Sequence, residues 1–174
     1  RVGMGNPQHF KLCADELIEL FKDDRLYKFL HIPVQSGSNR ILKLMKRGYA
    51  VEQYKALVKK FKLALPGLTI ETDLIAGFPG ETEEDFQQTI DLVKETRPDV
   101  VNVSRFGARP GTLAKKMPQQ LSGILKKERS TLLAKLTRKI AAENLQGMVG
   151  KTTAVYFSEK TAKGNFQGRT QNYL

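Results

Sequence analysis

Two carboxylates stand in or beside an apolar segment of the chain, TDLIAGFPGE (residues 72–81). Asp73 lies inside this segment and Glu71 comes just before it. Side chains alternate between the two faces of a strand, so Glu71 and Asp73 would share one face with Thr69 and Ile75. Buried carboxylates are costly unless they are paired or hydrogen-bonded. Two explanations stay open: a ligand with hydroxyl groups, such as a ribose, binds Asp73, or a nearby Lys or Arg forms a structural ion pair.

Polar and small residues also follow the ends of expected strands. Gln35 and Ser36 come directly after an expected strand at 29–34, and Gly77 lies at the end of another at 68–78. Ligands of parallel α/β folds bind at the carboxyl ends of strands, so these three residues are candidate binding residues. Pro, Gly and Ser also make ordinary turns, which is the structural alternative for both segments.

Histidine and cysteine offer little further chemistry. His31 lies on an expected strand, where a lone His is more often a core hydrogen-bonding residue than a catalyst. His9 and His31 have no third ligand spaced with them for a metal ion. The one cysteine, Cys13, allows no internal disulfide and no multi-cysteine iron–sulfur site, and it fits a reducing, cytoplasmic setting. Its helical register with apolar residues indicates a small buried hydrophobe.

Strand-like and helix-like segments alternate along the first part of the chain, and they would position the candidate residues. The patterns predict strands at 1–4, 29–34, 68–78 and 100–106 and helices at 10–22, 39–46, 51–65 and 82–94. Repeated βα units imply parallel strands covered by helices, as in an open α/β sheet or a (β/α) barrel. No apolar run approaches the ~18 residues of a membrane span.

The pattern changes after residue 118. A long helix is predicted at 122–144, and β-like segments follow residue 147. Two strands are too few for an independent domain. The sequence therefore predicts an α/β body at 1–118, a linker helix at 119–146 and the beginning of a small β module at 147–174.

The chain is strongly basic, with a formal net charge of +11 and a pI near 9.8. This balance favours a polyanionic partner, RNA first and a membrane surface second, with a solvated basic surface as the plain alternative. The β-like segments contain four aromatic residues that could include a base-stacking residue: Tyr156, Phe157, Phe166 and Tyr173. For at least two of them, packing within a small β barrel is the preferred interpretation. The candidate phosphate contacts are Lys115, Lys116, Lys126, Lys127, Arg129 and Arg169.

Three segments together resemble the radical-SAM methylthiotransferase family: HIPVQSGSNRILKLMKRGY (31–49), TDLIAGFPGETEEDF (72–86) and NVSRFGARPGT (102–112). The stretch GRTQNY (168–173) resembles the start of that family's RNA-binding TRAM domain. The motifs are most similar to the archaeal and eukaryotic branch, which methylthiolates N6-threonylcarbamoyladenosine next to the tRNA anticodon. The resemblance covers essentially the whole chain. It implies the C-terminal half of a radical-SAM (β/α) partial TIM barrel, followed by a long helix and the first strands of an incomplete TRAM β-barrel.

The resemblance also implies cofactors and residue roles. A full-length enzyme would bind S-adenosylmethionine (SAM) and two [4Fe–4S] clusters, and would act on tRNA. The cysteines for those clusters are not in this sequence, so the chain is expected to be inactive by itself and to hold no cluster. By position in related radical-SAM enzymes, Gln35, Arg47 and Asp73 would bind the ribose and carboxylate of SAM, with Ser36 and Gly77 close by. Two alternatives stay open: a ribosomal-protein aspartate as the substrate, or a non-catalytic RNA-binding module.

Overall fold

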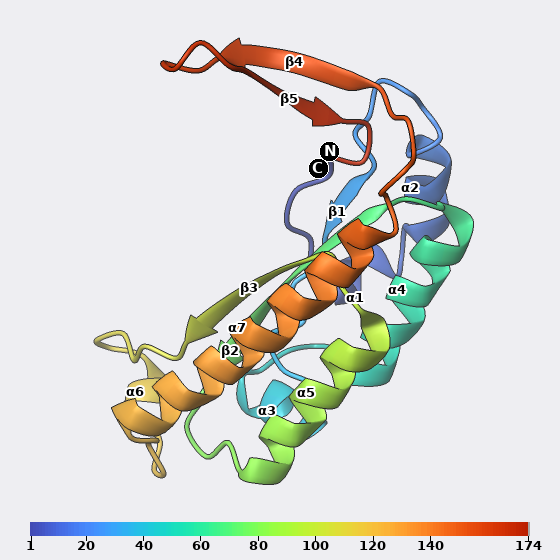
Figure 1. Cartoon of the computed structure of the whole chain (residues 1–174). Coiled ribbons are helices and arrows are strands. Elements are labelled where there is room, and N and C mark those ends of the chain that lie inside the picture. Colours follow the sequence, from blue (N-terminus) through green and yellow to red (C-terminus); the bar gives the residue numbers. More distant parts are fainter. Residues whose placement is uncertain (174) are drawn as a thin grey trace.

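The computed structural model describes residues 1–173, and a parallel three-stranded sheet forms the centre of this part of the chain. Strand β2 (Thr69–Ala76) lies between β1 (Phe29–His31) and β3 (Val100–Arg105), as Figure 1 shows. Val2 adds an isolated parallel bridge to Leu30. The carboxyl ends of the strands therefore meet at one edge of the sheet. This arrangement confirms the expected α/β class and the strands expected at 29–34, 68–78 and 100–106, which are shorter than predicted. The strand predicted at 1–4 is reduced to the single bridge at Val2.

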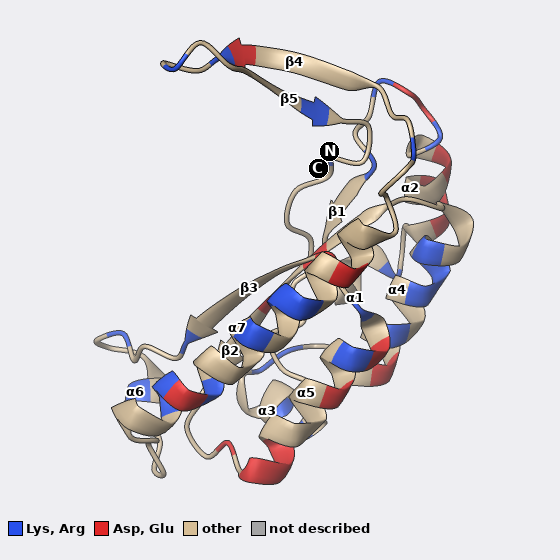
Figure 2. Ribbon diagram, viewed as in Figure 1, with Lys and Arg blue, Asp and Glu red and all other residues tan. Residues whose placement is uncertain are grey.

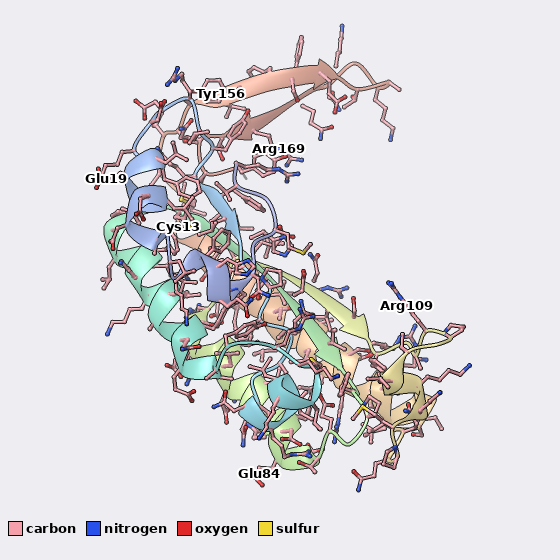
Figure 3. The ribbon with its side chains drawn as sticks, turned by 180° about the vertical axis from the view of Figure 1, so that it is seen from behind. Cys13, Glu19, Glu84, Arg109, Tyr156 and Arg169 are labelled. Carbon is pink, nitrogen blue, oxygen red and sulfur yellow. The ribbon has the colours of Figure 1, made fainter. Side chains whose placement is uncertain are left out.

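Long helices cover one face of the sheet and leave the other face open. These are α4 (Val51–Ala64), α5 (Glu83–Thr96) and α7 (Gly123–Gln146). Figure 1 shows them in front of the strands, and Figure 3, turned by 180°, shows the strands in front. Fully burying one large aliphatic or aromatic side chain stabilises the fold by about 1.5–3 kcal/mol. The buried side chains between helices and sheet include Ile70, Leu74, Tyr54, Leu57, Phe61, Phe86, Ile90, Val93, Leu133 and Ile140.

Strand β2 shows the alternation that the sequence predicts. Ile70, Thr72, Leu74 and Ala76 are buried against the helices, whereas Glu71, Asp73 and Ile75 are only partly buried on the open face. The two carboxylates therefore share one face, as expected. They face the side on which a ligand can approach rather than the hydrophobic core.

A single carboxylate joins the amino ends of two helices. Ser38 caps the short helix α3 (Asn39–Leu44) and donates its hydroxyl to Asp85 Oδ1 at 2.6 Å. Thr82 caps α5 and also hydrogen-bonds to Asp85. Arg40 pairs with the same carboxylate. Burial raises the pKa of Asp85, but the hydrogen bonds from Arg40, Ser38 and Thr82 outweigh burial and hold it well below its usual range.

The prediction of one continuous helix at 10–22 is wrong. The structure has two shorter helices, α1 (Pro7–Phe10) and α2 (Ala14–Leu20). Cys13 lies between them at φ −130°, outside the helical region, and begins the second helix. The change of direction turns both Phe10 and Ala14 into the core. Cys13 is partly buried against that core rather than fully buried.

The predicted linker helix is not a free connection between two parts. Helix α7 packs along β3, β2 and α5, and its Leu133 and Ile140 are buried. The short helix α6 (Leu113–Lys116) precedes it. Residues 123–146 therefore belong to the helical layer that covers the sheet.

An antiparallel hairpin ends the described chain. Strands β4 (Val155–Lys160) and β5 (Phe166–Thr170) pair with each other and lie beside the amino end of the sheet (Figure 1). Hydrogen bonds to the backbone of residues 171 and 172 attach the segment after β5 to the α/β body. Lys28 N donates to Gln171 O at 2.7 Å, and Thr69 Oγ1 donates to Asn172 O at 2.6 Å.

Candidate functional site

Four polar side chains from the three strands meet on the open face of the sheet. The register sets His31 beside Glu71 and Asp73 beside Asn102. His31 Nε2 lies 3.0 Å from Asp73 Oδ1, and its Nδ1 lies 3.6 Å from Glu71 Oε2. Asn102 Nδ2 donates to both carboxylates, at 2.9 Å to Glu71 Oε1 and 3.0 Å to Asp73 Oδ1.

This cluster explains how the sheet tolerates two carboxylates. The expected structural partner was a Lys or Arg, and the structure instead provides His31 and Asn102. The second carboxylate oxygen of Asp73, Oδ2, accepts no hydrogen bond from the described residues, 1–173. Glu71 is held by the same two partners but lies nearer the amino end of β2. The sequence missed His31 as a partner because His31 and Asp73 are 42 residues apart.

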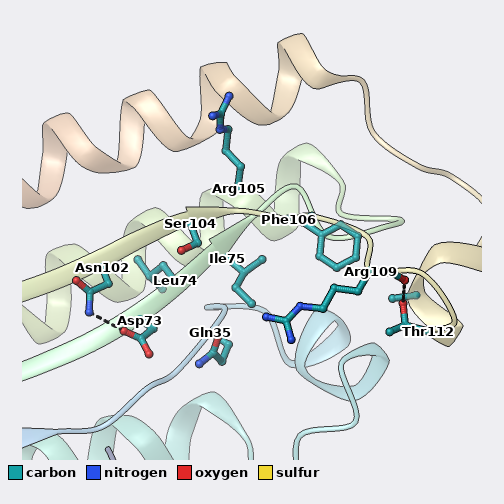
Figure 4. A pocket seen from close by; sticks show the side chains of 12 residues that line it. Gln35, Asp73, Leu74, Ile75, Asn102, Ser104, Arg105, Phe106, Arg109 and Thr112 are labelled. Atoms are coloured by element: carbon teal, nitrogen blue, oxygen red, sulfur yellow. Dashed lines mark hydrogen bonds between the residues drawn. The ribbon is translucent and has the colours of Figure 1, made fainter.

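A pocket of about 540 Å³ opens where the strands end. Figure 4 shows Asp73, Gln35 and Arg109 around it, with the Arg109 guanidinium on the side of Ile75 and Gln35. Its volume is typical of small-molecule sites. The residues that line it are Gln35, Asp73, Leu74, Ile75, Asn102, Ser104, Arg105, Phe106, Gly107, Arg109, Thr112 and Ala114.

Gln35 has an unusual backbone for a residue with a side chain. Its φ is +72°, a region that costs free energy for residues other than glycine. Its N–H donates to Asp73 O at 2.8 Å, and its carbonyl accepts Ile75 N–H at 2.9 Å. These bonds attach the loop after β1 to β2. They hold the Gln35 amide and the Asp73 carboxylate in one pocket although 38 positions of sequence separate them.

Arg47 does not line the pocket. Its Nε is buried and has no hydrogen-bond partner within residues 1–173. Its neighbour Tyr49 donates its hydroxyl to Val34 O at 3.0 Å. Burial raises the pKa of Tyr49 to about 12, and the charge of Arg47 opposes that rise. The structure therefore brings Gln35 and Asp73 together and leaves Arg47 outside the pocket lining.

Ser36 and Gly77 also lie outside the pocket lining. Ser36 is fully buried, and its Oγ accepts the Ser38 N–H at 3.2 Å. Gly77 has φ +79° and donates its N–H to Glu81 Oε2 at 2.9 Å. A side chain at Gly77 would meet the Lys126 side chain of α7 at 2.4 Å. Both residues shape the loops beside the pocket, and neither points a polar group into it.

Arg129 requires a correction, because the sequence suggested a phosphate contact and the structure buries this side chain. Its Nη1 lies 2.7 Å from Glu81 Oε2, and the two side chains are 6% and 2% exposed. Arg129 also reaches Glu83 at 3.0 Å. Burial raises the pKa of Glu81, and the hydrogen bonds from Arg129 and Gly77 oppose this. Arg129 is four residues before Leu133 on the buried stripe of α7, a spacing that could have revealed its position.

The remaining basic candidates have different surroundings. Lys115, Lys116 and Lys127 are exposed, whereas Lys126 is partly buried with its Nζ 5.3 Å from the centre of the Phe106 ring. Figure 2 shows Lys and Arg distributed along α7 and α4. Helices among residues 1–173 are all too short or too polar to cross a membrane. Nor do His, Cys, Asp and Glu gather in threes at metal-binding distance in that part of the chain.

Comparisons of the sequence and the fold with known proteins identify a family and several relatives. The Radical SAM superfamily profile matches residues 6–93. Probable threonylcarbamoyladenosine tRNA methylthiotransferases from Pyrococcus abyssi and Archaeoglobus fulgidus are 48% and 47% identical over 173 residues. A tRNA-2-methylthio-N(6)-dimethylallyladenosine synthase from Methylacidiphilum infernorum is 42% identical over 173 residues.

These alignments cover most of this chain and a smaller part of each relative. The two archaeal alignments cover 99% of this chain and 40% and 41% of the length of the two relatives. The third alignment covers 97% of this chain and 36% of the length of its relative. Coproporphyrinogen III oxidase from Escherichia coli, a radical SAM enzyme, superposes with a TM-score of 0.64 at 20% identity. That superposition covers 79% of this chain and 31% of the oxidase. The chain therefore spans about two fifths of the length of its archaeal relatives and shares its fold with a radical SAM enzyme.

Proposed function

Because the chain belongs to the Radical SAM superfamily, we propose that it forms the SAM-binding and RNA-facing part of a tRNA methylthiotransferase that acts on threonylcarbamoyladenosine. The observation that carries this proposal is the convergence of Gln35 and Asp73 in one pocket at the carboxyl ends of parallel strands. The similarity to archaeal tRNA methylthiotransferases over nearly the whole chain supports the reaction and the substrate.

The pocket residues fit the polar parts of SAM. Asp73 Oδ2 and the Gln35 amide would hold the ribose hydroxyls, because a carboxylate accepts and an amide both accepts and donates hydrogen bonds. The buried, unpartnered Nε of Arg47 supports an anionic ligand near the loop after β1, where the SAM carboxylate would lie. When bound, SAM supplies the methyl group and the means of breaking the adenine C–H bond.

His31 and Asn102 keep Asp73 in position for this role. Both hydrogen-bond to Asp73 Oδ1, which leaves Oδ2 directed to the ligand. Gln35 is fixed through its backbone bonds to β2. These residues would orient the ribose before any reaction and reduce the entropy cost of positioning it.

The clusters of a radical SAM enzyme need ligands from outside this chain. A [4Fe–4S] cluster is held by four thiolates or three thiolates and one other ligand, and the sequence has one cysteine, Cys13. The chain's residues do not fit a cluster, so no step of the reaction is assigned to them through one. The proposed domain division keeps an α/β body, now including α7, and the beginning of a TRAM-like β module from residue 147.

The polar side chains in the pocket favour threonylcarbamoyladenosine over dimethylallyladenosine. Asn102 and Ser104 of β3 face the pocket, and Arg109 adds a cation. A threonylcarbamoyl group carries a carboxylate, a hydroxyl and amide groups, whereas a dimethylallyl group is apolar and gains nothing from such a lining. The proposed partner is the anticodon region of tRNA, and the proposed location is the cytoplasm.

Mass spectrometry of nucleosides tests the proposal. Cells that lack the gene encoding this chain should lose 2-methylthio-N6-threonylcarbamoyladenosine from total tRNA and accumulate the precursor nucleoside. Reintroduction of the gene should restore the modified nucleoside. An unchanged nucleoside profile in the deletion strain would exclude this substrate.

A further inference from the structure

Three tyrosines and two arginines gather where the β4–β5 hairpin meets the amino end of the sheet. We refer to Arg1, Tyr27, Tyr156, Arg169 and Tyr173 as the junction cluster. Tyr27 contacts Tyr173 with ring centres 5.1 Å apart and Tyr156 with ring centres 6.2 Å apart. Tyr27 precedes β1, whereas the other two tyrosines come from the hairpin and the segment after it. The α/β body and the β module therefore form this surface together.

The hairpin register separates its aromatic residues into two groups. Tyr156 pairs directly with Arg169 across the hairpin, so their side chains lie on the same face. Phe157 and Phe166 contact each other with ring centres 5.8 Å apart, and Phe157 follows Tyr156 and so points to the opposite face. Tyr156 and Arg169 therefore face the α/β body, and Phe157 and Phe166 do not. Figure 3 shows Arg169 projecting from the hairpin toward the open, concave side of the molecule.

The two arginines of the junction cluster both lie against the Tyr173 ring. Arg1 Cζ is 4.9 Å and Arg169 Cζ is 5.0 Å from the centre of the Tyr173 ring. Neither arginine forms an ion pair with the described residues, 1–173. The ring stabilises two like charges only in part. An RNA phosphate carries one negative charge and would offset the charge of Arg169, because guanidinium groups match phosphate geometry through paired hydrogen bonds.

A pocket of about 370 Å³ is lined by Tyr27 and Tyr156 of the junction cluster. Tyr156, which is 52% exposed, and Tyr27 provide its aromatic surface, and Asp24, Arg25 and Gln171 complete it. The Gln171 side chain donates to Asp24 O at 3.0 Å and Leu26 O at 2.8 Å, so this wall is held in place before any ligand binds. An exposed aromatic face beside a fixed polar wall suits a flat, uncharged group such as a nucleobase.

We propose that the junction cluster binds one unpaired nucleotide of the RNA substrate. The base stacks on Tyr156 against the edge of Tyr27, and the adjacent phosphate lies against Arg169. This inference rests on the proposed function, because it takes RNA as the partner. It adds a site that spans the α/β body and the β module.

The bound nucleotide is not the one that reacts. The junction cluster lies beside the residues that precede β1 and β2, as the bonds from Lys28 and Thr69 to the segment after β5 show. The pocket with Gln35 and Asp73 lies at the opposite ends of the strands. An RNA strand held at the junction would cross the open face of the sheet, so the cluster would fix a nucleotide at some distance along the same strand and thereby place the target adenosine.

Equilibrium binding of a fluorescent anticodon stem-loop RNA to the complete protein that contains this chain tests the site. Arg169→Gln should weaken binding about tenfold and lower the salt dependence of binding by about one counterion. Tyr156→Leu should weaken binding by about 5- to 100-fold, as expected for a lost stacking contact, with the salt dependence unchanged. Tyr156→Phe should bind almost as tightly as the wild type because it keeps the ring. Lys163→Gln removes one charge at the exposed hairpin turn and serves as the matched control.

The possible outcomes distinguish a failure of the proposed nucleotide site from a failure of the proposed function. RNA binding by the wild type together with unchanged binding by Arg169→Gln and Tyr156→Leu would overturn the site and leave tRNA as the partner. Equal losses for Lys163→Gln and Arg169→Gln would also overturn it, because only general charge would then matter. Absence of RNA binding by the wild type would instead contradict the proposed function. Since Arg169 is exposed, its variant tests the site even if Tyr156→Leu reduces folding.

Discussion

Arg129 of helix α7 and Glu81 of the loop after β2 form a buried ion pair at 2.7 Å. Glu81 Oε2 also accepts the Gly77 N–H, so the pair connects the helix to the loop that follows the candidate binding strand. A buried pair costs desolvation free energy, and it stabilises the fold mainly because each partner compensates the other. Removal of one partner is therefore far more harmful than replacement of both.

Arg129→Met should destabilise the protein by about 3–5 kcal/mol, because Glu81 would be left buried without its counterion. The urea midpoint of unfolding measures this change. Glu83→Gln is the matched control, since Glu83 pairs with Arg129 from a side chain that is 79% exposed, and it should have little effect. The double variant Arg129→Met with Glu81→Met should recover most of the lost stability. A double variant as unstable as Arg129→Met alone would contradict the ion-pair explanation.

Gly77→Ala should destabilise the protein more than Gly67→Ala. Both glycines have positive φ, +79° and +84°, so both substitutions strain the backbone. Only at Gly77 would the new Cβ also meet a neighbour, the Lys126 side chain at 2.4 Å, whereas nothing lies within 4 Å at Gly67. Thermal unfolding of both variants measures the difference. Lys126→Ala should reduce the Gly77→Ala effect toward that of Gly67→Ala, and equal effects at the two glycines would refute the steric argument.

Asp85 should make stability depend on pH in the acid range. Its pKa in the folded protein is depressed from the ordinary 3.8, since the hydrogen bonds from Arg40, Ser38 and Thr82 outweigh the opposing effect of burial. A depressed carboxyl pKa contributes stability that is complete above the unfolded-state pKa and is lost as the pH falls through the folded-state pKa. The stability difference between wild type and Asp85→Asn should therefore be largest near neutral pH and shrink below about pH 4.

Urea unfolding at several pH values measures this difference. Asp91→Asn is the control, because the Asp91 side chain is 60% exposed in its ion pair. It should show almost no pH-dependent difference from wild type. A constant gap between wild type and Asp85→Asn down to acid pH would show that the Asp85 charge does not stabilise the two helix ends.

Asp73→Ala should weaken SAM binding about tenfold or more, because it removes charge-assisted hydrogen bonds to the ribose. Equilibrium binding of SAM to the complete, anaerobically reconstituted protein measures the affinity. Glu71→Gln should change it by no more than about twofold, since Glu71 shares His31 and Asn102 with Asp73 but does not line the pocket. Equal losses for the two variants would mean that the cluster acts only as a structural unit.

Local features of the sequence predicted much of the fold. The alternation of β2 and the helical spacing of α4 and α5 depend on interactions within a few residues. The motifs around Gln35 and Asp73 also indicated the end of the sheet at which the pocket lies. The break between α1 and α2 was missed because the turn at Cys13 depends on how Phe10 and Ala14 pack.

The sequence alone determined that Glu71 and Asp73 share a strand face, that the strands are parallel and covered by helices, and that the chain is basic. Only the tertiary structure decided which distant groups meet. The parallel register sets His31 beside Glu71. The rotation of α7, fixed by Leu133 and Ile140, buries Arg129 and leaves Lys127 exposed. These contacts join residues 40 or more positions apart, and they follow from packing of whole elements rather than from local preference.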